Sequence, residues 1–198
     1  MKKKIAIIGL GYVGLPLAVE FAKQYEVMGF DVDQSRIEEL KKNHDSTFEI
    51  KDDIVLLVRD NLDFTSNIND TKDCSIYIVS VPTPIDKFNN PDLKPLITSS
   101  QTVGTVIKKD DIIIYESTVY PGVTEDVCVK ELEKSSGLKF NQDFFCGYSP
   151  ERVNPGDKVN TLTKIKKITS GSTPEIAQEV DELYKSIITA GTFRAVSI

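Results

Sequence analysis

The first chemical signal in the sequence comes from three glycines and one acid. Gly9, Gly11 and Gly14 form a Gly-x-Gly-x-x-Gly turn between the apolar run at 5–8 and a helical pattern. In such a turn the first glycine permits a tight reversal, the second lets the backbone approach a pyrophosphate, and the third lets the helix pack against the strand. Asp31 follows the next apolar run, where a carboxylate accepts hydrogen bonds from ribose hydroxyls and repels the 2′-phosphate of NADP. The pattern predicts a binding site for NAD, and its plain alternative is a glycine-rich turn in an unrelated α/β protein.

Hydroxyl and carboxyl groups follow three later strand-like runs. The runs are 75–81, 112–115 and 143–148, and the polar residues after them are Thr83, Ser117, Thr118 and Glu151. Because the carboxyl ends of parallel strands meet at one edge of a sheet, we expect these side chains to lie beside the glycine turn. Thr118 there would hydrogen-bond the nicotinamide or a reacting water, and Glu151 would hold a water or act as a general base.

Several of these residues also have a plainer interpretation. Thr83 and Thr118 precede proline or helix signals, so each is also a candidate N-cap. Glu151 is a candidate for an ion pair with Arg152 or a nearby lysine, and such pairs are commonly weak and at the surface. Arg36 begins a helical pattern close to the acid of the second strand, where it would lie along the adenosine ribose or be an ordinary surface arginine.

Strand-like and helical patterns alternate along the whole chain. Strands are expected at 5–8, 26–30, 62–64, 75–81, 112–115, 143–148, 167–169 and 193–198, and helices at 13–22, 36–42, 94–107, 123–134 and 176–187. This order predicts an α/β fold in which a doubly wound parallel sheet of Rossmann type has helices on both faces. No long linker divides the sequence, so residues 1–198 are expected to form a single domain.

Composition excludes several classes of protein. The 198 residues are 40% hydrophobic and 27% charged, as in a packed globular protein, and the net charge of −6 argues against a nucleic-acid surface. Three lysines precede the first apolar run, but glycines interrupt that run and no cleavage site follows, so it does not read as a signal peptide. No apolar stretch reaches the roughly 18 residues that a membrane span needs. We expect a cytoplasmic protein without membrane contact.

Cysteine and histidine give no sign of a metal site. Cys74, Cys128 and Cys146 are an odd number, widely separated and without a Cys-x-x-Cys pair, which favours buried free thiols. His44 is the only histidine and lies at the end of a charged helical pattern. We expect no bound metal.

Four motifs together resemble the UDP-glucose/GDP-mannose dehydrogenase family. They are Gly-Tyr-Val-Gly-Leu-Pro-Leu at 11–17, Val-Pro-Thr-Pro at 81–84, Glu-Ser-Thr-Val-Tyr-Pro-Gly at 116–122 and Ser-Pro-Glu-Arg-Val-Asn-Pro-Gly-Asp at 149–157. The last two, together with Lys-Ile-Thr-Ser-Gly-Ser-Thr-Pro at 167–174, are most similar to the UDP-N-acetylhexosamine 6-dehydrogenase branch. The resemblance covers essentially the whole sequence and corresponds to the N-terminal NAD-binding domain of the family.

The resemblance implies a reaction and a set of contacts. In the family, the 6-hydroxymethyl of a nucleotide sugar is oxidised to a carboxylate while two NAD⁺ are reduced in succession, which supplies polysaccharide precursors, and a cysteine carries the intermediate. The resemblance implies cofactor contacts from Gly9, Gly11, Tyr12, Val13, Gly14, Asp31, Arg36, Val81, Pro82, Thr83, Ser117 and Thr118. It assigns the reacting water to Thr118 and Glu151. It assigns the UDP-N-acetylhexosamine to Glu151, Arg152, Val153 and Asn154.

Two departures from the family pattern matter. Pro155 occupies the position of a second glutamate in members that oxidise UDP-glucose, which disfavours glucose as substrate. The family's nucleophilic cysteine, assisting lysine, UDP-binding domain and dimer-forming central helix correspond to positions after Ile198. We therefore expect the C-terminal substrate domain to be absent, the fragment to be monomeric and inactive alone, and the full-length protein to be a homodimer.

Two other functions remain open from the sequence. One is a stand-alone NAD-binding module without catalysis. The other is a β-hydroxyacid dehydrogenase, which shares the first glycine turn but not the motifs at 116–122 and 149–157.

Overall fold

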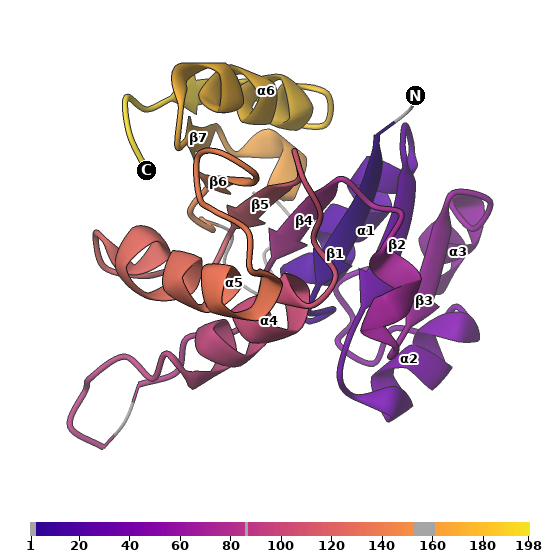
Figure 1. Ribbon diagram of the computed structural model, residues 1–198. Helices are drawn as coiled ribbons and strands as arrows, with labels where there is room; N and C mark the ends of the chain where they lie inside the picture. The colour runs from indigo at the N-terminus through magenta and orange to yellow at the C-terminus, as the bar shows by residue number, and fades with distance from the viewer. Residues whose placement is uncertain (1–2, 86, 153–160) are drawn as a thin grey trace.

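The described chain folds around one twisted sheet (Figure 1). The computed structural model describes residues 3–85, 87–152 and 161–198. Within these ranges eight strands lie in the order β3-β2-β1-β4-β5-β6-β7-β8. They are β1 (Lys4–Ile8), β2 (Glu26–Phe30), β3 (Leu62–Thr65), β4 (Ile76–Val79), β5 (Ile112–Tyr115), β6 (Phe145–Tyr148), β7 (Lys167–Gly171) and β8 (Thr192–Arg194).

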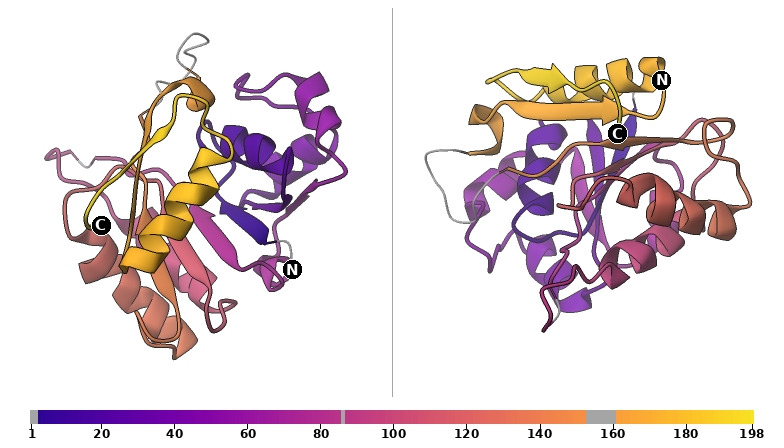
Figure 2. Two further views of the ribbon diagram at one scale, coloured as in Figure 1. Left: turned by 90° about the horizontal axis from the view of Figure 1, so that it is seen from above. Right: turned by 90° about the vertical axis from the view of Figure 1, so that its left-hand side faces the viewer.

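Helices cover both faces of this sheet, as the alternating pattern predicts. They are α1 (Gly14–Ala22), α2 (Gln34–Lys41), α3 (Asp52–Leu57), α4 (Lys94–Gly104), α5 (Val129–Ser136) and α6 (Pro174–Lys185). Short helical turns are η1 (Ile68–Thr71), the π-turn η2 (Thr124–Cys128) and η3 (Leu162–Lys164). The helices α1, α2, α3 and α6 contribute to one apolar cluster, and α4 and α5 contribute to the other. Figure 2 shows α6 and the α4–α5 pair on opposite sides of the strands.

The central strands β4 and β5, and β1 after Lys4, are apolar because both of their faces are buried. In β1, Ile5 and Ile7 pack into the cluster under α1, while Ala6 and Ile8 pack into the cluster under α4 and α5. Side chains alternate between the faces of a strand, so a strand covered on both sides reads as one continuous apolar run. None of the helices in the described ranges has the length and apolar character needed to cross a membrane.

The predicted doubly wound α/β sheet is confirmed, with one difference at its edge. β7 pairs antiparallel to β6, whereas β8 is parallel to β7. A parallel neighbour requires a crossover connection, usually a helix, and α6 provides one between β7 and β8. Between β6 and β7 the described residues contain only the three-residue turn η3. The last two strands therefore run opposite to the other six of the described sheet.

Candidate functional site

The three glycines of the first turn serve different geometric needs. Gly9 has φ +92° and its N–H donates to the Phe30 carbonyl at 2.8 Å. A Cβ on Gly14 would lie 1.8 Å from the Gly9 carbonyl oxygen, so only glycine allows α1 to start this close to the strand. A Cβ on Gly11 would meet nothing within 4 Å. Gly11 therefore faces open space at the point where a ligand would approach the backbone.

The N-terminus of α1 is open to an anion. Val13 occupies the N-cap position without a side-chain cap, and no acidic residue lies in the first turn. The first N–H groups of a helix have no partner inside the helix, and the helix dipole adds positive potential at that end. These features match the pyrophosphate site that the sequence predicts.

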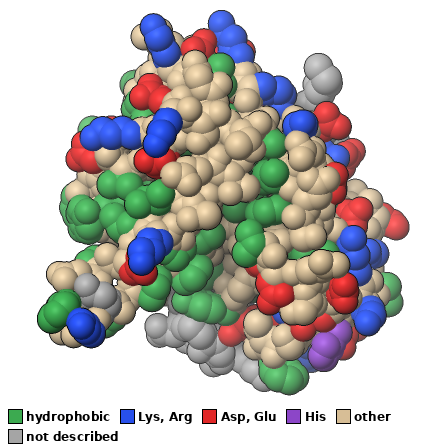
Figure 3. Space-filling view, turned by 60° about the horizontal axis from the view of Figure 1, so that its bottom comes forward, with side chains coloured by type: hydrophobic (Ala, Val, Ile, Leu, Met, Phe, Trp, Pro, Cys, Tyr) green, Lys and Arg blue, Asp and Glu red, His purple; other side chains and the backbone are tan. Residues whose placement is uncertain are grey.

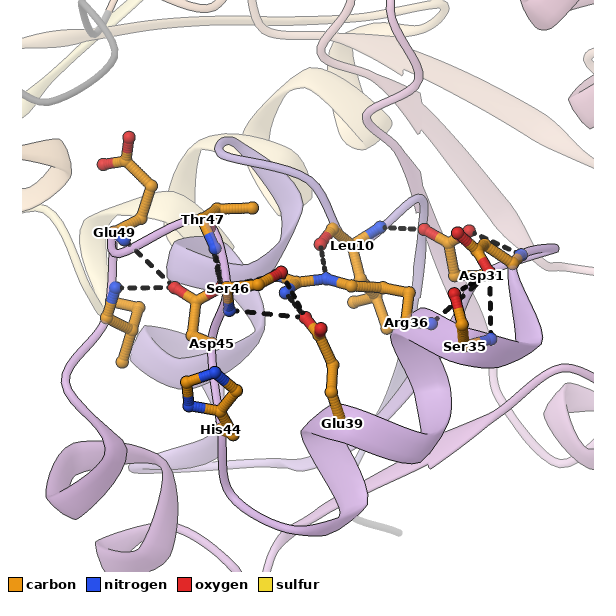
Figure 4. Close-up of polar contacts among 12 residues, drawn as sticks. Leu10, Asp31, Ser35, Arg36, Glu39, His44, Asp45, Ser46, Thr47 and Glu49 are labelled. Carbon is orange, nitrogen blue, oxygen red and sulfur yellow. Dashed lines mark hydrogen bonds and ion pairs between the residues drawn. The ribbon is translucent and has the colours of Figure 1, made fainter.

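Asp31 and Arg36 hold opposite sides of the Leu10 peptide (Figure 4). One carboxylate oxygen of Asp31 accepts the Leu10 N–H at 2.8 Å, and the other accepts the Asp33 N–H at 3.0 Å. The Arg36 Nε donates to the Leu10 carbonyl at 2.9 Å. The Asp33 side chain caps α2 by accepting the Ser35 and Arg36 N–H groups, and so fixes where this helix begins. The glycine turn is thus tied to β2 and α2.

The interpretation of Arg36 as a surface arginine is wrong. Its side chain is buried, with 9% of the residue exposed, and its guanidinium forms ion pairs with Glu39 and with Asp45, the latter at 2.8 Å. Sequence reasoning missed Asp45, which lies in a polar stretch without a recognisable motif. Burial alone would raise the pKa of Asp45, but hydrogen bonds from Thr47, Ile50 and Arg36 hold it below its usual value.

A cavity of about 670 Å³ joins the glycine turn to the ends of β4, β5 and β6. Its volume is in the range of small-molecule sites. Figure 3 shows a central hollow with hydrophobic side chains gathered around it. The predicted residues that line the cavity are Gly9, Gly11, Tyr12, Val13, Asp31, Val81, Pro82, Thr83, Ser117, Thr118 and Glu151. Gly14, Arg36 and Arg152 are not among its lining residues.

Hydroxyl groups tie the ends of β4 and β5 together. The Ser117 hydroxyl donates to the Val81 carbonyl at 2.5 Å, and the Thr83 hydroxyl donates to the Thr118 carbonyl at 2.7 Å. The N-cap alternative is wrong for both threonines, because Leu93 is the N-cap of α4 and Val123 that of the following π-turn. The threonines are instead at the rim, where their side chains reach the cavity.

Glu151 reaches the same cavity beside a buried ion pair. Its N–H donates to the Glu116 carbonyl at 3.1 Å, and its carboxylate lies 3.4 Å from the Lys167 ammonium. Lys167 also pairs with the fully buried carboxylate of Glu116 at 2.5 Å. Burial raises the pKa of Glu116, whereas the charge of Lys167 acts against that rise. The predicted ion pair with a nearby lysine is thus present, but that lysine is buried, so the interpretation as a weak surface pair is wrong.

The sugar-facing residues predicted from the resemblance are only partly placed. Val153 and Asn154 lie outside the described residues. The Arg152 guanidinium donates to the Lys166 carbonyl at 3.0 Å, and the Arg152 N–H donates to a carboxylate oxygen of Glu151 at 2.6 Å.

Helix α4 supplies a wall of the cavity that sequence reasoning missed. Lys94, Thr98 and Thr102 all line it, together with Pro95 and Ser99. The first three recur at every fourth position, which places them on one face of a helix. That spacing was available in the sequence, but nothing local indicates that the polar face of this helix turns toward the glycine turn.

The donors and the shape of this cavity fit a dinucleotide. Gly11 offers open backbone, the N-terminus of α1 offers uncapped N–H groups, and Asp31 lies at the end of β2. In the first β-α-β unit of a dinucleotide site, the glycine turn and the helix N-terminus bind the pyrophosphate, and the acid at the end of the second strand binds the adenosine ribose.

Comparison with known proteins agrees with this geometry. The model of the UDP-glucose/GDP-mannose dehydrogenase family, NAD binding domain, matches residues 3–188. The UDP-N-acetyl-D-glucosamine 6-dehydrogenase of Pseudomonas aeruginosa is 60% identical over 195 residues, which are 98% of this chain and 46% of that protein. Protein CapL of Staphylococcus aureus is 54% identical over 198 residues, which are 100% of this chain and 46% of that protein.

A solved structure supports the same assignment. The UDP-D-ManNAc dehydrogenase from Pyrococcus horikoshii superposes with a TM-score of 0.87 at 33% identity, over 96% of this chain and 46% of that one. The chain thus spans about half the length of the relatives that it matches. It belongs to the UDP-glucose/GDP-mannose dehydrogenase family, and its fold is the NAD-binding domain of that family.

Proposed function

We propose that this chain binds NAD for a UDP-N-acetyl-D-glucosamine 6-dehydrogenase, which oxidises the sugar's C6 hydroxymethyl to a carboxylate. The 60% identity to a relative named for that activity supports the substrate. Pro155 supports it too, because members that oxidise UDP-glucose resemble one another in having a glutamate there. The observation that carries the proposal is the single cavity that brings together the glycine turn, Asp31 and the rim residues Thr118 and Glu151.

The chain's own residues hold the cofactor in this proposal. Bound NAD supplies the hydride acceptor of the reaction. The open backbone at Gly11 and the N–H groups at the start of α1 bind the pyrophosphate, and Asp31 accepts hydrogen bonds from the adenosine ribose. Arg36 supports the turn by donating to the Leu10 carbonyl, and the negative charge of the Asp31 carboxylate disfavours a 2′-phosphate.

Thr118 and Glu151 orient and activate a water at the end of the cavity formed by β5 and β6. The Thr118 side chain is exposed at the rim and orients a water by hydrogen bonding. Glu151 accepts a proton from that water as a general base. Arg152 follows in a loop proposed to face the sugar. The oligomeric state expected from the sequence stays a prediction.

Calorimetric titration of this chain with NAD⁺ and NADP⁺ tests the cofactor assignment. We expect NAD⁺ to bind at least about tenfold more tightly, which corresponds to about 1.4 kcal/mol of repulsion between Asp31 and the 2′-phosphate. Asp31→Asn should abolish most of that preference, since it keeps an oxygen for the Leu10 N–H and removes the charge. Asp31→Ala should weaken both ligands as well, because it also releases the glycine turn.

Glu38→Ala is the matched control, since it removes an acidic charge from the exposed side of α2. It should leave both affinities unchanged. Equal binding of NAD⁺ and NADP⁺ by the wild-type chain would contradict the role given to Asp31.

A further inference from the structure

We propose that Lys167 is a positioning residue for Glu151: its buried ammonium, anchored by Glu116, fixes the Glu151 carboxylate at the edge of the cavity. This inference rests on the proposed function, in which Glu151 accepts a proton from the reacting water.

The antiparallel direction of β7 places this lysine at the site. Gly147 pairs with Gly171, and Tyr148 pairs with Ser170. Each step forward along β6 is therefore a step backward along β7. Continued for three residues, the same register sets Lys167 opposite Glu151. A parallel β7 would present its last residue at this edge instead of its first. The one irregularity of the sheet therefore brings a cation to the rim.

The ammonium of Lys167 has three N–H donors, and the part of the chain that the structure describes offers it three acceptors. They are a carboxylate oxygen of Glu116 at 2.5 Å, a carboxylate oxygen of Glu151 at 3.4 Å and the Pro150 carbonyl at 3.4 Å. Only 2% of Lys167 is exposed, and its ammonium lies 5.8 Å from the centre of the Tyr184 ring. Two of these acceptors belong to the segment that follows β6, so the lysine holds that segment as well as the carboxylate.

Glu116 acts as an anchor and not as the reacting acid. One of its oxygens accepts from Lys167 and the other accepts from the Tyr184 hydroxyl. Both oxygens of Glu116 are thus engaged by buried side chains. Both glutamates line the cavity, but the Glu116 side chain is fully buried, whereas that of Glu151 is 11% exposed. Lys167 donates to one oxygen of the Glu151 carboxylate, and the Arg152 N–H donates to the other. A fixed carboxylate at the rim is what orientation of a water requires.

Replacing Lys167 alone would leave the buried Glu116 charge without a cation, and such changes are strongly destabilising. The informative variant is therefore Glu116→Gln combined with Lys167→Met. It removes both charges of the buried pair at similar volume and keeps an oxygen for the Tyr184 hydroxyl. Lys167→Arg keeps a cation and serves as the rescue variant.

The experiment uses the complete protein that contains this chain, with NAD⁺ and UDP-N-acetyl-D-glucosamine, and follows NADH formation. The double variant should lose between about tenfold and a hundredfold in kcat, as expected for a misplaced reacting group. Its KM, its Kd for NAD⁺ and its thermal midpoint should stay close to those of the wild type. Glu116→Gln alone should lose less kcat than the double variant, because Lys167 still reaches Glu151. Lys167→Arg should retain much of the wild-type kcat, because it keeps a cation beside Glu151.

Lys3→Met is the control, since Lys3 pairs with Glu179 of α6 at the surface and should not affect kcat. A double variant with wild-type kcat would overturn the proposal. So would a parallel fall of kcat, NAD⁺ affinity and thermal midpoint, which indicates a structural role only. A wild-type protein that binds NAD⁺ but does not oxidise the sugar would overturn the proposed function itself, and the inference with it.

Discussion

At the scale of single residues, the glycine turn separates two kinds of restraint. Gly14 is needed by the fold, because its Cβ would overlap the Gly9 carbonyl oxygen and approach the Ser80 hydroxyl to 2.5 Å. Gly11 is surrounded by open space in the same turn, so the fold itself does not demand a glycine there. The sequence motif shows both glycines alike, whereas the structure assigns one to packing and leaves the other to the ligand.

This difference predicts opposite behaviour of two alanine variants. Gly11→Ala should leave the free energy of unfolding nearly unchanged and weaken NAD⁺ binding at least about tenfold, because its methyl group meets the pyrophosphate. Gly14→Ala should lower the free energy of unfolding by about 3 kcal/mol or more, because the overlap is with backbone. Urea unfolding and calorimetric titration of both variants check this. Wild-type affinity in Gly11→Ala would mean that the pyrophosphate does not approach this backbone.

At the scale of elements, a buried carboxylate organises the connection from α2 to α3. Asp45 accepts the N–H groups of Thr47, Glu49 and Ile50 as well as the Arg36 guanidinium. Arg36 in turn holds the Leu10 carbonyl of the glycine turn. The connection that the sequence shows only as a polar stretch is thus linked to the cofactor loop through one arginine.

The lowered pKa of Asp45 gives this link a definite pH dependence. A carboxylate whose pKa is lower in the folded state stabilises the fold above its unfolded value, 3.8, and loses that effect as the pH falls through the folded value. Asp45→Asn should therefore lower the free energy of unfolding by about 2 kcal/mol near neutral pH. The difference from wild type should shrink below about pH 4.

Urea unfolding at neutral pH and in acid measures this difference. Asp60→Asn, at an exposed position, is the control and should change stability by less than about 0.5 kcal/mol at either pH. A difference for Asp45→Asn that stays constant with pH would show that the charge of Asp45 is not what stabilises the connection.

At the scale of the whole molecule, the three thiols of this chain all belong to one of its two apolar clusters, the one that includes α4 and α5. All three cysteines are free and buried, and each is at most 1% exposed. Burial raises the pKa of Cys74 to about 12 and that of Cys128 to about 11, and it raises the pKa of Cys146 as well. The thiolate is the nucleophilic form, so a catalytic thiol would have to come from residues other than these three.

Thiol titration of the native and the unfolded chain tests this conclusion. With an aromatic disulfide reagent at about pH 8, the native chain should react over hours or not at all, because the pKa values of its thiols lie well above that pH. The urea-unfolded chain should release three equivalents at once, one for each cysteine. Rapid reaction of one native thiol, blocked by NAD⁺, would place a cysteine at the cofactor site and contradict the buried assignment.

The sequence by itself determined the features that depend on short stretches of neighbouring residues. The apolar runs and helical spacings gave the alternating elements, the glycine spacing marked the cofactor turn, and the motifs after the strands gave the rim residues and the family. Periodicity and turn chemistry act over a few neighbouring residues, so they can be recognised without knowing the fold.

Only the tertiary structure decided which partners the polar groups find. Lys167 lies 16 positions from Glu151 and 51 from Glu116, and it meets both because β7 runs antiparallel to β6. Arg36 is buried because the connection after α2 brings Asp45 into contact with its guanidinium. Thr83 donates to the Thr118 carbonyl after β5 instead of capping a helix. Ion pairs and hydrogen bonds of this kind depend on which strand ends and connections are packed together, and no local pattern of residues specifies that.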